Sequence, residues 1–199
     1  MNPADQTAIE SVFRLVNREV WIVTAGHEEH RGGLVATWVL QASIDPESPL
    51  LVTGIAPNHF TAELIQRSRS FAAHLIPLQR IDLAERFGVG SSRTRDKFSG
   101  LEVRKEKTGS PILADALAWL DCRLVAEYDA GDRVYFWGEV VGGGQGQPGA
   151  PLTERVLFSA AGPELLQRLS SDRGADIVVQ RPLRQKWRAA VETPQVASL

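Results

Sequence analysis

The stretch that most constrains the fold is residues 33–44, where side chains alternate between two faces as in a β-strand. One face is wholly apolar, and its members are Leu34, Ala36, Trp38, Leu40, Ala42 and Ile44. The other face is partly polar but uncharged, and its members are Val35, Thr37, Val39, Gln41 and Ser43. A strand face open to water is usually polar and carries charge, so we expect a ligand or a second subunit to cover this one. An ordinary Thr- and Ser-rich strand face is the alternative.

Further strand patterns predict an antiparallel barrel. Residues 20–25 and 71–76 are short apolar runs, and residues 50–56 are almost continuously apolar, as in a strand covered on both faces. Residues 120–128 alternate, and a polar turn joins them to a strand over residues 134–141 as a β-hairpin. About six strands with few helices favour a mainly β fold, a Greek-key antiparallel barrel with peripheral helices, over a doubly wound sheet.

Helices and loops are expected around this barrel. Apolar residues at helical spacing near the N-terminus predict a first helix: Ile9, Val12, Phe13 and Val16. Three more helices are expected: one that starts near Asn58 or Thr61 and ends near Arg67, one over residues 78–87, and one over residues 163–169. Residues 88–99 and 142–149 have the composition of loops, and the tail from Arg181 shows no periodicity.

Size and composition fit one domain of ordinary size with appendages. The chain has 199 residues, of which 43% are hydrophobic and 23% charged, as in globular proteins. We expect a domain over residues 1–160 with its core at about 20–141, followed by a C-terminal helix and tail over residues 161–199. The 22 basic and 24 acidic residues leave a net charge of -2, which argues against a dedicated nucleic-acid binder.

The cysteine count and the lengths of the apolar runs limit the kinds of site and the cellular location that the protein can have. Cys122 is the single cysteine, which excludes an intrachain disulfide and a multi-cysteine metal site. It lies on an apolar strand face and is interpreted as inert packing. Residues 1–7 lack the features of a signal peptide, and no stretch approaches the ~20 apolar residues of a membrane-spanning helix. We therefore expect a soluble, cytoplasmic protein with no membrane partner.

Uncharged hydrogen-bonding residues gather at the predicted ends of strands and helices. Three share the polar strand face: Thr37, Gln41 and Ser43. Three lie at a predicted helix N-terminus, a natural seat for a phosphate: Asn58, His59 and Thr61. Four form a basic, hydroxyl-rich loop: Ser91, Ser92, Arg93 and Lys97. Flavin mononucleotide (FMN) needs this mixture, because its phosphate requires donors and its ring an apolar slot with a few polar contacts. Taken singly, these residues could equally cap helices or belong to a solvated loop.

The chain resembles the flavin-reductase-like split-barrel family in four blocks that keep the family's order. The first block is Gly33-Leu34-Val35-Ala36-Thr37-Trp38-Val39 with Gln41-Ala42-Ser43-Ile44-Asp45-Pro46, and the second is Asn58-His59-Phe60-Thr61 with Phe71-Ala72-Ala73-His74-Leu75. The third block is Ser91-Ser92-Arg93 with Asp96-Lys97-Phe98, and the fourth is Leu120-Asp121-Cys122-Arg123 with Gly131-Asp132-Arg133. The resemblance covers about residues 20–141 and implies an FMN-binding split β-barrel.

The resemblance also implies a site and a quaternary structure. It implies a homodimer with FMN, or less often FAD, in a groove near the subunit interface. The first block would contribute flavin contacts from Thr37, Trp38, Gln41, Ala42 and Ser43. The second and third blocks would hold the ribityl phosphate with Asn58, His59, Thr61, Ser92, Arg93 and Lys97. Two features depart from the family pattern: Arg133 replaces a histidine that is associated with the nicotinamide side, and the segment after Gly142 is unfamiliar.

The implied activity is that of an FMN-dependent oxidoreductase, an NAD(P)H:flavin reductase in which NAD(P)H passes a hydride to flavin N5. The electrons would continue to an oxygenase or another acceptor. No side chain is expected to act as acid, base or nucleophile, because the cofactor carries the chemistry. Two alternatives stay open at this point: a tightly FMN-bound electron-carrier flavoprotein, and a non-enzymatic split-barrel flavin-binding protein.

Overall fold

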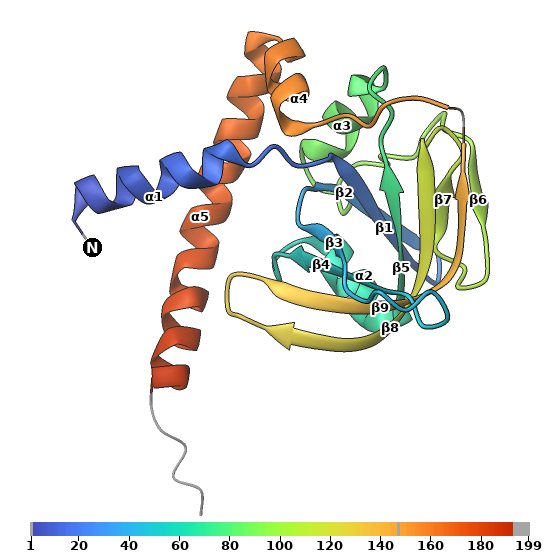
Figure 1. The fold of residues 1–199 in the computed structure, drawn as a ribbon, viewed down its shortest axis with the longest axis horizontal. Coiled ribbons are helices and arrows are strands. Elements are labelled where there is room, and N and C mark those ends of the chain that lie inside the picture. The colour runs from blue at the N-terminus through green and yellow to red at the C-terminus, as the bar shows by residue number, and fades with distance from the viewer. Residues whose placement is uncertain (1, 147, 193–199) are drawn as a thin grey trace, which may run out of the picture.

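The computed structural model describes residues 2–146 and 148–192, and it is built on one curled antiparallel sheet (Figure 1). Its strands are β1 (Trp21–His27), β2 (His30–Ala36), β3 (Val39–Gln41), β4 (Leu50–Ile55), β5 (Ser70–Leu75), β8 (Ala118–Asp129) and β9 (Val134–Gln145). Hydrogen bonds connect them in the order β2-β1-β5-β8-β9-β4-β3, and each neighbouring pair is antiparallel. The predicted antiparallel barrel with peripheral helices is confirmed.

The sheet is a split barrel because its two edge strands, β2 and β3, follow one another along the chain. A short hairpin of β6 (Val103–Lys105) and β7 (Pro111–Leu113), absent from the sequence prediction, packs against it. The helices are α1 (Pro3–Leu15), α2 (Phe60–Ser68), α3 (Ile81–Gly88), α4 (Glu154–Ala160) and α5 (Pro163–Glu192). Within the described ranges, no helix combines the length and the apolar character needed to cross a membrane.

Two apolar clusters hold the barrel and its helices together. Neighbouring residues of β1 point to opposite faces of the sheet, so Val23 joins one cluster and Ile22 the other. The first cluster fills the barrel, where Phe71 and Phe136 pack beside the buried face of α2. The second cluster lies against α3 and includes Phe87. The elements that carry the site are therefore anchored from both faces of the sheet.

The prediction of one continuous strand over residues 33–44 is wrong. A bend at Thr37 and Trp38 separates β2 from β3, and the chain crosses there from one edge of the split sheet to the other. The bend also breaks the alternation of faces, since Val39 is buried whereas Leu40 is 65% exposed and Ile44 98% exposed. Alternation along the sequence could not reveal this crossing, because the apolar and polar residues keep alternating through residues 33–44 although the buried face changes at the bend.

Two predictions at the C-terminal side are also corrected. Residues 142–145, predicted as part of a loop, belong to β9, where the Trp119 ring lies 2.8 Å from the position that a Cβ on Gly144 would take. Glycine is needed there because the Trp119 ring packs directly on the backbone of β9, and not because the segment has to be flexible. The helix predicted over residues 163–169 continues as α5 to Glu192, through much of the segment that shows no periodicity. The rest of that tail, residues 193–199, lies outside the described residues.

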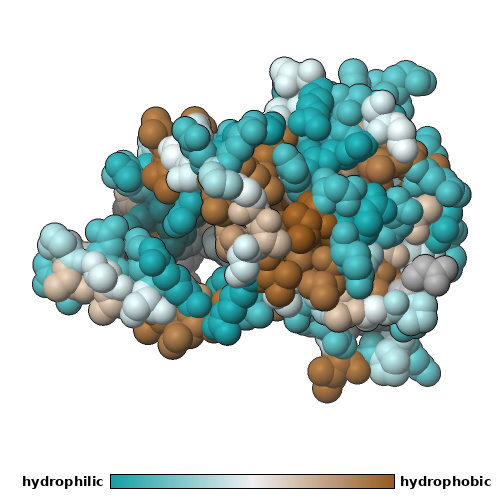
Figure 2. Space-filling view, turned by 90° about the horizontal axis from the view of Figure 1, so that it is seen from above, coloured by the Kyte–Doolittle hydropathy of each residue, from teal (hydrophilic) through white to brown (hydrophobic). Residues whose placement is uncertain are grey.

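The N-terminal helix forms as predicted but does not pack against the barrel. None of the α1 residues is buried, and Val12 and Phe13 are each 61% exposed. Figure 2 shows this part of the chain as an arm that reaches away from the body and carries apolar as well as polar side chains. An exposed apolar helix face of this kind is typical of an interaction surface.

Candidate functional site

A cavity of about 290 Å³ brings together five of the predicted site residues: Asn58, His59, Thr61, Ser92 and Lys97. Its walls come from β2, the first turn of α2, the loop after α3, and α5. We call it the α2 cavity. Backbone N–H groups at a helix N-terminus carry partial positive charge, so the cavity has the position that an anion prefers.

Local sequence explains how β2 and the two helices meet at the α2 cavity. Gly32 and Gly33 lie side by side on β2, and a Cβ on Gly32 would approach Leu64 of α2 to 2.8 Å. A Cβ on Gly33 would approach the Phe87 ring of α3 to 2.7 Å. The absence of side chains at these positions lets both helices pack directly on the strand, which places Thr61 against β2.

The N-terminus of α2 is not capped as the sequence suggested. The helix was expected to start near Asn58 or Thr61, but the N-cap residue is His59, which makes no side-chain capping hydrogen bond. The Asn58 side chain turns instead toward α5. Thr61 lies in the first turn and is buried at the cavity wall.

Lys97 brings a cation to the α2 cavity. The side chain is buried, and its Nζ donates a hydrogen bond to the Phe87 carbonyl at 2.8 Å. Burial lowers the pKa of Lys97 to about 8; the positive charge of Arg95 acts in the same direction, whereas Asp172 opposes it. A buried ammonium is costly unless it is paired, so an anion in the cavity would stabilise it.

The two other predicted residues of this loop have different surroundings. The Ser92 Oγ donates to the Gly33 carbonyl and accepts from the Gly33 N–H at 3.1 Å, so it ties the loop to β2 at the cavity wall. Arg93 lines a neighbouring groove instead of the α2 cavity. Its guanidinium pairs with Glu63 and lies 4.5 Å from the centre of the Phe60 ring.

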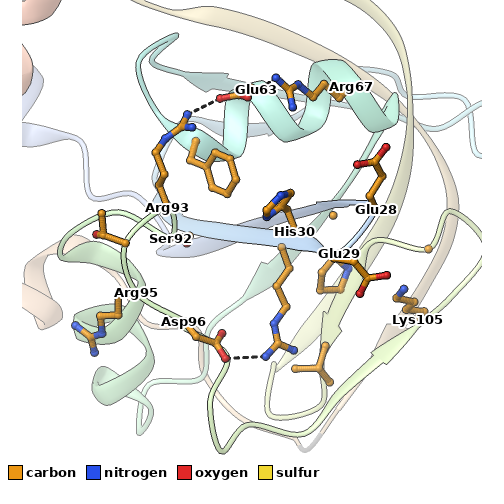
Figure 3. A pocket seen from close by; sticks show the side chains of 17 residues that line it. Glu28, Glu29, His30, Glu63, Arg67, Ser92, Arg93, Arg95, Asp96 and Lys105 are labelled. Atoms are coloured by element: carbon orange, nitrogen blue, oxygen red, sulfur yellow. Dashed lines mark hydrogen bonds and ion pairs between the residues drawn. The ribbon is translucent and has the colours of Figure 1, made fainter.

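The neighbouring groove is larger, about 1070 Å³, and strongly charged (Figure 3). Glu63 lies between Arg67 and Arg93 and pairs with both, so the pKa of its carboxyl is lowered, chiefly by the hydrogen bond from Arg93. Across the groove, Arg31 pairs with Asp96 at 2.9 Å. The three arginines Arg31, Arg67 and Arg93 of the groove are therefore each paired with a carboxylate. No local sequence pattern indicated these ion pairs.

The remaining predicted residues lie along the bend, at the end of β3 and in the loop between β3 and β4, outside the lining of the α2 cavity. At the bend, Thr37 is half-buried and Trp38 is exposed, with the Arg133 guanidinium 5.0 Å from the centre of its ring. Arg133 therefore covers an aromatic face at the position where the family resemblance expects a histidine. Such a cation–π contact orients the guanidinium over the ring.

The polar side chains after the bend hold the loop to β4. The Ser43 Oγ donates to the Ser48 carbonyl and accepts from the Leu50 N–H, both at 2.8 Å. Gln41 donates to the Ser43 carbonyl at 2.6 Å, and the Ala42 N–H donates to the Leu50 carbonyl. These bonds give the loop one defined shape beside the bend.

Sequence reasoning missed three residues of α5 that lie at the site. Asp172 and Asp176 line the α2 cavity, and Gln180 bonds to Asn58 at its edge. They are spaced by four residues, so they share one face of the helix. That spacing was the available signal, but it could be used only once the helix was known to extend past residue 169.

Cys122 has the surroundings expected of inert packing. Cys122 is buried, and burial raises the pKa of its thiol to about 12, as expected for packing rather than nucleophilic chemistry. His27 and His30 pair with each other at the closed end of the β1–β2 hairpin. In the described part of the chain, no cluster of three His, Cys, Asp or Glu residues could hold a metal ion.

A comparison with family models identifies the domain. Residues 13–155 match the model of the flavin reductase like domain. The chain belongs to this family. The match includes every strand of the split barrel, the α2 cavity walls from β2 and α2, and the loop of Lys97, and it ends before α5.

Individual relatives share the fold and part of the sequence. The reductase subunit HsaB of a flavin-dependent monooxygenase from Mycobacterium tuberculosis is 26% identical over 136 residues, which is 68% of this chain and 70% of that protein. The structure of nitrilotriacetate monooxygenase component B from Mycobacterium thermoresistibile is 28% identical, with a TM-score of 0.67, and the match covers 75% of this chain and 82% of that one. The FMN-binding protein from Thermus thermophilus is 30% identical, with a TM-score of 0.61 and coverage of 65% and 71%.

The chain spans only part of several other relatives. It covers 46%, 23% and 58% of the length of the first three curated proteins that it matches. Those proteins contain further sequence that has no counterpart here. Their full activities therefore do not transfer directly to this chain.

Proposed function

We propose that this protein is an FMN-dependent NAD(P)H:flavin reductase that seats the FMN phosphate in the α2 cavity. The observation that carries the proposal is the convergence of Asn58, His59 and Thr61 with Ser92 and the buried Lys97 around one helix N-terminus. These residues come from two segments about 30 positions apart, and family resemblance had assigned both to one phosphate. Backbone donors, a hydroxyl and a cation are the groups that a phosphate needs.

The ring would lie on the side of the bend, where Thr37, Trp38, Gln41, Ala42 and Ser43 are the proposed contacts. The hydrogen bonds of Ser43 fix the loop there, so its backbone is already ordered for a ligand. Bound flavin supplies the hydride chemistry. The chain contributes binding and orientation, and it needs no acid or base of its own.

The reductant and the acceptor belong to the same proposal. We propose NADH or NADPH as the hydride donor and an oxygenase as the acceptor. In support, two of the relatives are a reductase subunit and a component of monooxygenases. The relative from Thermus thermophilus binds FMN, which favours FMN over FAD. A cytoplasmic location, where nicotinamide nucleotides are freely available, suits this reaction.

The proposal includes a homodimer. The exposed apolar residues of α1 have no partner surface on the described barrel, and they include Val12, Phe13 and Leu15, with Val16 directly after the helix. A second copy of the chain would bury them. Such burial is the dominant driving force in most protein association.

The first experiment is a spectrum of the purified protein before and after FMN is added and the excess removed. Retained absorption near 370 and 450 nm, roughly where flavin cofactors absorb, identifies bound flavin. Anaerobic NADH or NADPH should then bleach the 450 nm band. Bound flavin that neither nucleotide bleaches would replace the reductase proposal with a tightly bound electron carrier, and a chain that retains no flavin would favour the non-enzymatic protein.

A matched pair of variants tests the location. Thr61→Val removes one buried hydroxyl from the α2 cavity and should weaken FMN binding about tenfold, the loss expected for one hydrogen bond to a charged group. Thr94→Val makes the same change at an exposed position of the loop that carries Ser92 and Lys97, outside the α2 cavity, and should leave the affinity unchanged. Fluorescence titration measures the FMN affinity of both variants. Equal affinities of the two variants would contradict the proposal that the phosphate binds in the α2 cavity.

A further inference from the structure

One polar stripe of α5 faces the α2 cavity. Asp172, Asp176 and Gln180 form it, and we call it the α5 stripe. Asp172 accepts a hydrogen bond from the Gly90 N–H at 3.1 Å. The two oxygens of Asp176 bond to the Asn58 Nδ2 and the His59 Nε2, each at 2.9 Å. The stripe is therefore bonded to residues that the proposed function assigns to the phosphate.

Gln180 extends the same contact beyond the cavity. Its amide donates to the Asn58 Oδ1 at 3.2 Å and accepts from the Arg133 guanidinium at 2.6 Å. Arg133 is also the residue that covers Trp38 at the bend. The stripe thus connects the two groups of proposed flavin contacts, one at α2 and one at the bend.

A carboxylate and a phosphate require the same donors. The Asp176 carboxylate receives hydrogen bonds from Asn58 and His59 at the N-cap end of α2, where an anion is favoured. Asp172 acts on Lys97 electrostatically and favours its charged form. A phosphate dianion that entered the cavity would have to displace these carboxylates, because like charges so close together repel strongly.

The α5 stripe contacts the α2 cavity through hydrogen bonds, and we expect such polar docking to be reversible. Among the described residues of α5, only Leu165 and Gln180 are buried. Several of its apolar residues past the first turns face outward, and Val178 is 74% exposed, whereas Trp187 is half-buried beside Gly131. Asp172 is exposed and Asp176 is half-buried. Exposed or half-exposed polar pairs contribute little to stability, so little free energy holds these two carboxylates in place.

The sequence of α5 also weakens the helix around the stripe. Gly174 lies between Asp172 and Asp176, and glycine costs about 1 kcal/mol relative to alanine inside a helix. Pro182 follows Gln180 and cannot donate the hydrogen bond that a helix expects from that position. The segment that carries the stripe can therefore loosen without unfolding the barrel.

We propose that the α5 stripe is a built-in competitor for the flavin phosphate, so that α5 must leave the α2 cavity before flavin binds. This inference rests on the proposed function. While α5 is docked, a molecule cannot bind flavin. Only the fraction of molecules with α5 released binds it, and the apparent flavin affinity is reduced by that fraction. By linkage, bound flavin keeps α5 released, which would signal the loaded state to a partner protein.

The full-length double variant Asp172→Asn/Asp176→Asn tests the competition. It keeps the shape of the side chains but removes both charges, and we expect the apparent Kd for FMN to fall about tenfold. Glu164→Gln is the matched control, since it makes the same change at an exposed position in the first turn of α5. Fluorescence titration of FMN measures all three proteins. Weaker or unchanged binding in the double variant would overturn the inference.

Hydrogen exchange separates displacement from simple charge repulsion. Adding FMN to the wild-type chain should speed exchange of backbone amides over residues 172–181 at least severalfold, whereas the strands stay protected. Exchange that stays the same or slows in this segment while FMN binds would overturn the inference and leave the proposed function intact. Failure of wild type and variants alike to bind FMN would instead reject the proposed function.

Discussion

Lys97 is the residue whose surroundings differ most from those of an ordinary lysine. Its side chain is 2% exposed, and the pKa falls from the usual 10.5 to about 8. In the unfolded chain, Lys97 keeps its proton up to pH 10.5, so between pH 8 and 10.5 the unfolded state binds more protons. The free energy of unfolding should therefore rise with pH between pH 8 and 10.5. Below pH 8, the folded protein is destabilised by the full cost of burying the charged Lys97.

The same pKa predicts how flavin binding depends on pH. Lys97 loses its proton near pH 8 in the flavin-free protein, so we expect FMN affinity to decrease from pH 7 to pH 9. Lys97→Met should bind FMN more weakly at pH 7 and show a flat profile over this range. Lys105→Met, an exposed lysine in the neighbouring groove, should keep the wild-type profile. Titration of FMN fluorescence at several pH values checks this, and identical slopes in all three proteins would contradict it.

At the scale of the elements, strands with strong local patterns were predicted well. The apolar runs that became β1, β4 and β5 specify a strand through their own composition, and the β8–β9 hairpin follows from its turn. The break between β2 and β3 and the glycine-rich end of β9 could not be predicted, because both depend on which strand lies next to the chain. The length of α5 was missed because many of its apolar residues face outward, so their spacing does not repeat as that of a core-facing helix does.

Close packing between elements also makes a testable prediction on β9. A Cβ on Gly138 would lie 2.7 Å from the Phe71 ring and 2.8 Å from the Cys122 Cβ, in the centre of the barrel cluster. Gly138→Ala should therefore destabilise the protein by about 1–3 kcal/mol, the usual cost of overpacking a core. Gly142→Ala on the same strand meets its nearest neighbour at an ordinary 3.6 Å and should cost much less. Urea unfolding measures both, and equal midpoints would refute the prediction.

At the scale of the whole molecule, the fold brings together some of the residues that the sequence analysis assigned to one site and separates others. Asn58, Thr61 and Lys97 were assigned to one anion site from separate blocks, and the fold does bring them to one cavity. Arg93 belongs to a neighbouring groove instead, because Glu63 pairs with it across the fold. The α5 contacts were missed for a related reason: the four-residue spacing of Asp172, Asp176 and Gln180 shows that they share a helix face, but it does not show which part of the fold that face meets.

The arm formed by α1 predicts the state of association. If a second copy covers its apolar face, the wild-type protein should be a dimer by light scattering, and Val12→Ser/Phe13→Ser should shift it toward the monomer without loss of barrel structure. Gln6→Ser, an exposed change on the same helix, is the control. A wild-type monomer at micromolar concentration, or a double variant that stays dimeric, would show that the arm serves something else.

The buried thiol of Cys122 has a consequence for chemical durability. Reduced flavin reacts with oxygen, and peroxide is a usual product of that side reaction, so the proposed chemistry exposes the protein to an oxidant of its own making. Peroxide attacks thiolates, and a thiol that is buried with a pKa of about 12 offers almost none. The chain holds one cysteine and one methionine in total. It therefore presents very little oxidisable sulfur and should keep its fold through many turnovers in air.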